Sequence, residues 1–125
     1  KGGKGESPSL VVGNIPAGAD AIIVEFSNRD YAPHDNGGHG MIGYSLSPWV
    51  ATATLPSIPS NVSEGFPPGI WIEKVNLGNG MGYNGPCSGG KGNKYEADVK
   101  AVVKATKDGA PGKLLGTGRI TLGRY

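Results

Sequence analysis

The most informative stretch of the chain is Ala21-Ile22-Ile23-Val24-Glu25-Phe26, which follows the turn-forming cluster at residues 13–20. Its β-branched residues favour an extended strand that packs on a half-buried surface. Outward from it, four further apolar runs have the same character: residues 11–12, 41–46, 70–72 and 114–122. The 23 glycines and 10 prolines among 125 residues oppose long helices and suit strands joined by turns. The sequence therefore predicts a mostly β protein.

The stretch 95–105 fits two patterns. Charged residues alternate with Ala and Val along it, as in a half-buried strand. Val99, Val102 and Val103 would also share one face of a helix. Periodicity alone leaves both interpretations open, and we favour a strand because no convincing N-cap residue precedes the stretch. This strand would form a hairpin with residues 114–122.

Size and charge narrow the possible classes of protein. A chain of 125 residues is one domain, which we expect to span residues 1–125 with a flexible N-terminal segment at 1–6. The net charge of +2 without a basic run argues against nucleic acid as a partner. The longest apolar run, 21–24, is interrupted by Glu25, which argues against a membrane span. Prolines within residues 55–69 predict an ordered but irregular surface segment.

The N-terminus and the cysteine content bear on the compartment. Lys1-Gly2-Gly3-Lys4-Gly5 has neither an initiator Met nor the apolar core of a signal peptide, as in a processed chain. We therefore expect a secreted or periplasmic protein. Cys87 is the single cysteine, so stability must come from the core rather than from an internal disulfide. Asn61-Val62-Ser63 is a glycosylation sequon that such a compartment could use.

Three segments of the chain carry recognisable motifs. They are Ser7-Pro8-Ser9-Leu10 with residues 14–25, Asp30-Tyr31-Ala32-Pro33 with the strand that follows to Pro48, and Gly82-Tyr83-Asn84-Gly85-Pro86-Cys87 with Asn93-Lys94-Tyr95. In order and spacing these segments resemble the phosphatidylethanolamine-binding protein family, in particular its small bacterial and archaeal members. The resemblance implies an antiparallel β-sandwich. The chain looks reduced beside that family, because residues 108–112 make only a short turn where many relatives carry a helical insertion, and because the first strand is missing.

The resemblance also implies a site. In the family, an anion pocket for phosphate-like head groups is built from an aspartate, a strand histidine, a Gly-Pro segment, and a later histidine and tyrosine. Carried over to this chain, it marks six ligand-binding residues: Asp30, His39, Tyr83, Pro86, Asn93 and Tyr95. Direct counting puts Met41 at the strand histidine, whereas a shift in the loop offers His39; Asn93 stands where the family has the later histidine. Met has no N–H and Asn only a neutral amide, so we expect weak anion binding.

Metal or catalytic chemistry has little support. His34, Asp35 and His39 could ligate zinc or copper, but no fourth ligand is evident and solvated loop histidines are more common. Cys87 with one of these histidines lacks the third member that a hydrolase needs, and a small buried cysteine is the simpler interpretation. We therefore expect no metal, no cofactor and no enzymatic activity.

Glycines and aromatic residues suggest two further binding features. Gly85 and residues 89–92 could form an anion nest beside Lys91, although a turn between strands is the more common role of such a segment. Four aromatic side chains could line a sugar- or lipid-binding surface, or pack in the core and at its rim: Tyr31, Trp49, Trp71 and Tyr83. The sequence does not separate these alternatives.

The expected function is that of a non-enzymatic binding domain with a degenerate anion pocket. It would bind a small anionic or polar ligand weakly, or a protein partner. The alternative is a structural, self-assembling extracellular subunit with no small-molecule ligand. A low net charge, glycine-rich loops and open sheet edges would favour such contacts between copies of the chain and a homo-oligomer.

Overall fold

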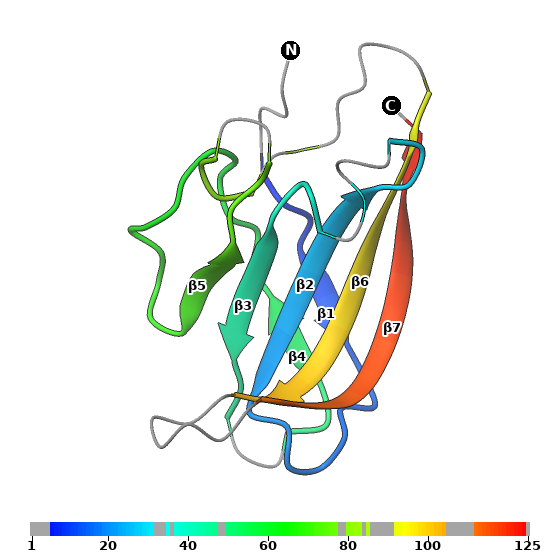
Figure 1. Cartoon of the computed structure of the whole chain (residues 1–125). Coiled ribbons are helices and arrows are strands. Elements are labelled where there is room, and N and C mark those ends of the chain that lie inside the picture. Colours follow the sequence, from blue (N-terminus) through cyan, green and yellow to red (C-terminus); the bar gives the residue numbers. More distant parts are fainter. Residues whose placement is uncertain are drawn as a thin grey trace.

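The computed structural model describes residues 6–31, 35, 37–47, 50–77, 80–83, 85, 92–104 and 112–124 (Figure 1). These residues form no helix and seven strands: β1 (Leu10–Val12), β2 (Ala21–Asn28), β3 (Met41–Ser45), β4 (Ala53–Leu55), β5 (Ile70–Lys74), β6 (Lys94–Val103) and β7 (Lys113–Arg124). One antiparallel sheet has the order β5-β3-β2-β6-β7, and the other is the pair β1-β4. The prediction of a mostly β protein is confirmed for this part of the chain. No helix suited in length and hydrophobicity to crossing a bilayer occurs among these residues.

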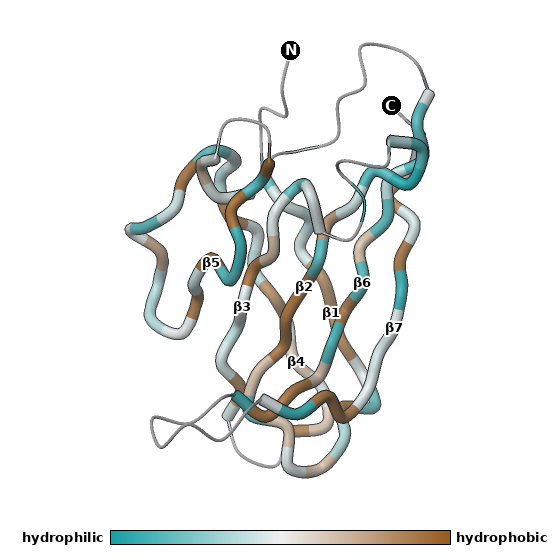
Figure 2. Tube along the Cα trace, viewed as in Figure 1, coloured by the Kyte–Doolittle hydropathy of each residue, from teal (hydrophilic) through white to brown (hydrophobic). Residues whose placement is uncertain are grey.

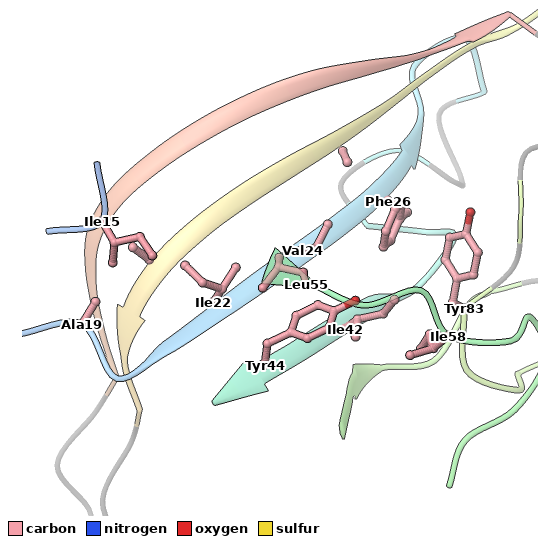
Figure 3. Packing of buried hydrophobic residues seen from close by; sticks show 12 residues of the cluster. Ile15, Ala19, Ile22, Val24, Phe26, Ile42, Tyr44, Leu55, Ile58 and Tyr83 are labelled. Atoms are coloured by element: carbon pink, nitrogen blue, oxygen red, sulfur yellow. The ribbon is translucent and has the colours of Figure 1, made fainter. Parts of the chain in front are cut away.

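β2 is the centre of the larger sheet, with β3 on one side and β6 on the other. Val24 lies opposite Ile42 of β3 and Val99 of β6. Alternate side chains of a strand point to the same face. On β2, Ile22, Val24 and Phe26 are 0%, 0% and 2% exposed and belong to the core (Figure 3). The apolar run therefore forms a strand because it can be buried between two neighbours and beneath a second layer.

The core lies between the larger sheet and the β1-β4 pair, which lies behind the larger sheet in Figure 1. Leu55 of β4 and Ile58 just after it are 2% and 1% exposed, and both belong to the same core cluster as the β2 side chains. Figure 2 shows β2 as a nearly continuous hydrophobic stretch, whereas β6 alternates between hydrophobic and hydrophilic residues. This alternation fits a strand with one face on the core and one face away from it.

The strand prediction for residues 95–105 is confirmed, because β6 spans Lys94–Val103 and pairs with β7. The sequence did not predict β4. The segment 55–69 is irregular, as expected, but its placement at the surface was wrong for Leu55 and Ile58. Prolines remove donors from a strand ladder, yet they do not prevent neighbouring apolar side chains from facing the core. Glu6 is joined to this region, since it forms an isolated antiparallel bridge with Pro59.

Candidate ligand-binding site

Three of the predicted site residues, His39, Tyr83 and Tyr95, lie where β2 ends and β3 and β6 begin. His39 contacts Tyr95, and both His39 and Tyr83 contact Phe26. The imidazole of His39 meets the ring of Tyr95 edge to face, with 5.1 Å between centroids. The backbone N–H of His39 donates to the carbonyl of Phe26 at 3.0 Å. The Phe26 ring in turn meets the ring of Tyr83 at 4.4 Å between centroids (Figure 3). Antiparallel pairing thus brings together residues from three distant segments.

Asn28 connects Asp30 to this group. Its Nδ2 donates to the hydroxyl oxygen of Tyr95 at 3.2 Å, and its Oδ1 accepts from the backbone N–H of Asp30 at 3.0 Å. Asp30 Oδ2 accepts from the backbone N–H of Lys94 at 2.7 Å. Asn28 is 3% exposed, so its amide is held by buried hydrogen bonds. Sequence reasoning missed it, although a polar residue at the end of an apolar strand and two residues before Asp30 was the available signal.

The cluster has a buried floor and a more exposed rim. Tyr83 and Tyr95 are each 1% exposed and His39 is 6% exposed. Asp30 is exposed and Asn93 is half-buried. Asp30 and Asn93 are therefore more accessible to solvent than the aromatic side chains and His39.

The register of the strands decides between His39 and Met41, the two residues that the sequence offered at the position of the strand histidine. Met41 lies opposite Glu25, so its side chain points away from the core. There it lines a hollow with Trp71. His39 instead contacts Tyr95. The structure thus joins His39, and not Met41, to the other candidate residues.

Gly40 lets the segment that carries Tyr83 approach the sheet. Its φ is +107°, and a Cβ at this position would lie 2.8 Å from the carbonyl oxygen of Gly82 and 3.0 Å from Cα of Tyr83. Two hydrogen bonds fix the same segment: Asn76 Nδ2 donates to the Gly82 carbonyl at 3.1 Å, and the Asn61 N–H donates to the Tyr83 carbonyl at 2.7 Å. Only glycine combines this backbone conformation with such a close contact.

An ion-pair network begins at Arg29, the residue after β2. Its guanidinium donates to the carboxylates of Asp35, Glu96 and Asp98, with 3.0 Å from Nε to Glu96 Oε1. Arg119 Nε donates to Asp98 at 2.6 Å. Burial by itself would raise the pKa of Glu96 and Asp98. The hydrogen bond from Arg29 and the charges of Lys94 and the two arginines lower the pKa of Glu96 below its ordinary value, and hydrogen bonds and charges from Arg119 and Arg29 lower that of Asp98. The network neutralises the acidic side chains next to the candidate site.

The structure gives the metal hypothesis no support within the described residues, which contain no group of three or more His, Cys, Asp or Glu able to hold an ion. Asp35 is an ion-pair partner of Arg29. Several residues discussed from the sequence lie outside the described part of the chain: His34, Trp49, Pro86, Cys87 and Lys91. Of the six predicted site residues, Pro86 is thus the one that the structure does not describe.

The side chains of the cluster carry hydrogen-bonding groups. Asp30 offers acceptors, and the Tyr95 hydroxyl and the His39 ring can each donate or accept. Three hollows formed by described residues lie elsewhere. One of about 310 Å³ lies between the β1 region and β7, one of about 650 Å³ lies on the opposite face of the larger sheet, and one of about 470 Å³ is lined by residues of β2, β6 and β7. Comparison with known proteins finds no match to a family model, a curated protein or a solved structure.

Proposed function

We propose that this chain is a non-enzymatic binding module with a single, reduced β-sandwich domain of the phosphatidylethanolamine-binding type. It binds a small anionic or polar ligand, or a protein partner, through Asp30, His39, Tyr83, Pro86, Asn93 and Tyr95. One observation carries the proposal. Residues that the motifs single out in three separate segments meet through Phe26 and Asn28.

The chemistry of these side chains supports a weak site for a polar ligand. Imidazole, phenol and amide groups recognise a ligand by hydrogen bonds, whose net contribution is modest when water competes. The nearby arginine, Arg29, is committed to three carboxylates and is not available to pair with an anion. An anionic group therefore meets hydrogen-bond donors rather than a free guanidinium, which limits its affinity.

Nuclear magnetic resonance titration with phosphoethanolamine tests this proposal. We expect saturable shifts of the backbone amide signals of Asp30, Asn93 and Lys94, with a Kd in the millimolar range, or about −4 kcal/mol. Asn93→Ala should weaken binding. Asn14→Gly is the matched control, because Asn14 is an exposed asparagine in the turn before β2, at the other end of that strand, where its φ of 52° suits glycine.

Three results would count against the site. The amides of Asp30, Asn93 and Lys94 would not shift, or Asn14→Gly would weaken binding as much as Asn93→Ala. A micromolar Kd would contradict the degenerate pocket, since about −8 kcal/mol requires an intact charged site.

A second candidate function, assembly from copies of the chain, is favoured by the edge strand β7. This strand has 12 residues and pairs with β6 on one side, and no other described strand pairs with it. Leu114 and Ile120 on it are 54% and 39% exposed. An open, partly apolar edge is a template for a strand from another chain. Light scattering over a concentration series, with and without residues 1–6, tests it: a constant monomer mass in both cases rejects assembly.

A further inference from the structure

The face of the larger sheet that points away from β1 and β4, here called the outer face, carries a half-buried indole. Trp71 of β5 lies opposite Gly43 of β3. A Cβ at Gly43 would lie 2.1 Å from the indole Cε2, so the ring occupies the space above this glycine. The indole N–H donates to Glu73 Oε1 at 2.9 Å. The ring is thus held on the outer face by the glycine beneath it and by a hydrogen bond at its edge.

An open hollow of about 650 Å³ adjoins this indole. Its lining residues Ile23 and Met41 alternate along their strands with the core residues Ile22, Val24 and Ile42, so the hollow lies on the face of the larger sheet away from the core. Apolar side chains in its lining include Ile23, Met41, Val102 and Leu114. Charged side chains in its lining are Glu25, Glu73, Lys100, Lys104 and Lys113. The hollow therefore combines an aromatic ring, an apolar floor and charged groups, which is the composition of a small-molecule site.

The uncompensated charge of this hollow is positive. Glu25 Oε2 pairs with Lys100 Nζ at 2.7 Å, and Glu73 accepts the indole N–H. The ammonium groups of Lys104 and Lys113 have no carboxylate partner within the described part of the chain. Three lysines and two glutamates in the lining leave a net charge of +1, because the indole N–H does not neutralise Glu73. Among the described residues, Lys104 Nζ contacts the neutral Ser45 hydroxyl at 3.5 Å and the Trp71 ring, so its charge can pair with an anion.

We propose that this hollow is a second binding site, for a ligand in which a ring with an apolar face bears a carboxylate. The ring stacks on Trp71, since aromatic and sugar rings both pack well on an indole. The carboxylate pairs with Lys104 or Lys113 by a charge-assisted hydrogen bond. Aromatic acids and sugar acids share this chemistry. The site lies on the outer face, and its lining shares no residue with the candidate site around Asp30, so the proposal is independent of the function proposed above.

Lys104 has a specific role in this proposal. Its Nζ lies over the Trp71 ring, 5.7 Å from the centroid. Cation–π contacts at exposed positions are weak, so the ammonium can exchange the indole for the carboxylate of the ligand. The vacated ring then accepts the ring of the ligand. An uncharged ring cannot compensate Lys104 in this way and should bind more weakly.

The test follows the indole N–H signal of Trp71 by nuclear magnetic resonance. The chain has two tryptophans, and Trp49→Phe assigns the remaining indole signal to Trp71. The probes are benzoate and glucuronate, and the matched neutral controls are benzamide and methyl glucoside, all at constant ionic strength. We expect a saturable shift with at least one acid and a Kd at least about threefold higher for its neutral control. A response to benzoate alone identifies an aromatic acid, and a response to glucuronate alone identifies a sugar acid.

Charge variants locate the anion. Lys104→Gln and Lys113→Gln should each raise the Kd roughly threefold, while keeping an apolar stem of similar length. Lys74→Gln is the matched control, because it removes the same charge from β5 at a position outside the lining of the hollow. It should leave the Kd unchanged.

The proposal is overturned by any of three results. Neither acid shifts the Trp71 signal at about 20 mM, well above a weak Kd. A neutral control binds as tightly as its acid. Lys74→Gln weakens binding as much as Lys104→Gln, which would show a general charge effect. The amides of Asp30 and Asn93 report on the other site in the same spectra, so the two proposals can fail separately.

Discussion

Arg29 links carboxylates that come from distant parts of the chain. The planar guanidinium carries five N–H donors and can serve several acceptors at once. Its side chain is 16% exposed, and those of Glu96 and Asp98 are 8% and 17% exposed. Ion pairs at such positions are less screened by water than exposed pairs, so the loss of one partner leaves the others poorly compensated. The cost of that loss should be visible in stability.

We predict that Arg29→Met lowers the free energy of unfolding by roughly 1–3 kcal/mol, a value reduced from that of fully buried pairs because the network is partly exposed. The cause is the charge left on Glu96 and Asp98. Urea denaturation measures the change. Arg119→Met is the control, because the Arg119 side chain is 58% exposed and Asp98 keeps Arg29 as its partner. The control should lose less, and equal losses would contradict the central position of Arg29.

The lowered pKa of Glu96 and Asp98 makes stability depend on pH. A carboxyl whose pKa is lower in the folded state stabilises the fold fully above its unfolded pKa of about 4. That contribution is lost as the pH falls through the folded pKa. We predict a stability that is level from about pH 7 to pH 5 and decreases below about pH 4. Urea denaturation midpoints measured across this pH range check the prediction. The stability of Arg29→Met should decrease less steeply with falling pH, and identical pH profiles for the two proteins would show that Arg29 does not cause the pH dependence.

Among the structural elements, close backbone approaches determine how loops join the strands. Gly82 has a φ of +59°, and a Cβ there would lie 1.9 Å from the carbonyl oxygen of Val62. Gly80 has a φ of +73°, but a Cβ there would meet nothing within 4 Å. The two glycines share a left-handed backbone conformation and differ in their surroundings. Alanine substitutions at the two glycines therefore separate the free-energy cost of a left-handed backbone conformation from the cost of a steric clash with residue 62.

We predict that Gly82→Ala destabilises the fold by roughly 2–4 kcal/mol, because the backbone of residue 62 cannot move aside as a flexible side chain can. Gly80→Ala should cost only about 1 kcal/mol, the price of a left-handed conformation for a residue with a Cβ. Thermal or urea unfolding of both variants measures the difference. Similar losses in the two variants would mean that the contact with residue 62 contributes nothing.

In the molecule as a whole, stability should decrease outward from the centre of the larger sheet. β2 and β6 each have a strand on both sides, whereas β5 and β7 have one described neighbour. β1 has three residues and pairs with β4 alone among the described strands. Backbone amides exchange with solvent through local opening, which is rarest where pairing and burial coincide.

We predict slow amide hydrogen exchange at Val24 and Val99, the central residues of β2 and β6, and fast exchange along β1. Exchange measured by nuclear magnetic resonance at constant pH gives the protection of each amide. Uniform protection across all strands would show that the molecule opens only as one unit. Faster exchange at Val24 than along β1 would contradict the observed strand order.

The sequence named several residues that contact one another in the structure, but it did not show how they are connected. Motifs pointed to Asp30 and Tyr95, because the resemblance places particular residue types at particular positions. Asn28 was not identified, since its role depends on the hydroxyl of Tyr95, 67 residues away along the chain. The choice between His39 and Met41 also required the structure, because Met41 lies opposite Glu25 on the face away from the core, whereas His39 contacts Tyr95.

The sequence by itself determined the strand β2, because its run of β-branched and apolar residues acts locally. For β6 the periodicity fitted both a strand and a helix, and the pairing with β2 and β7 decided for the strand. The formation of β4 depends on the tertiary structure alone, because its three residues become a strand by pairing with β1. The tertiary structure also determines that Ile58, within a proline-rich segment, is only 1% exposed, and that the Trp71 ring lies over Gly43. Each of these depends on which distant segment lies opposite, and local propensity carries no information about that neighbour.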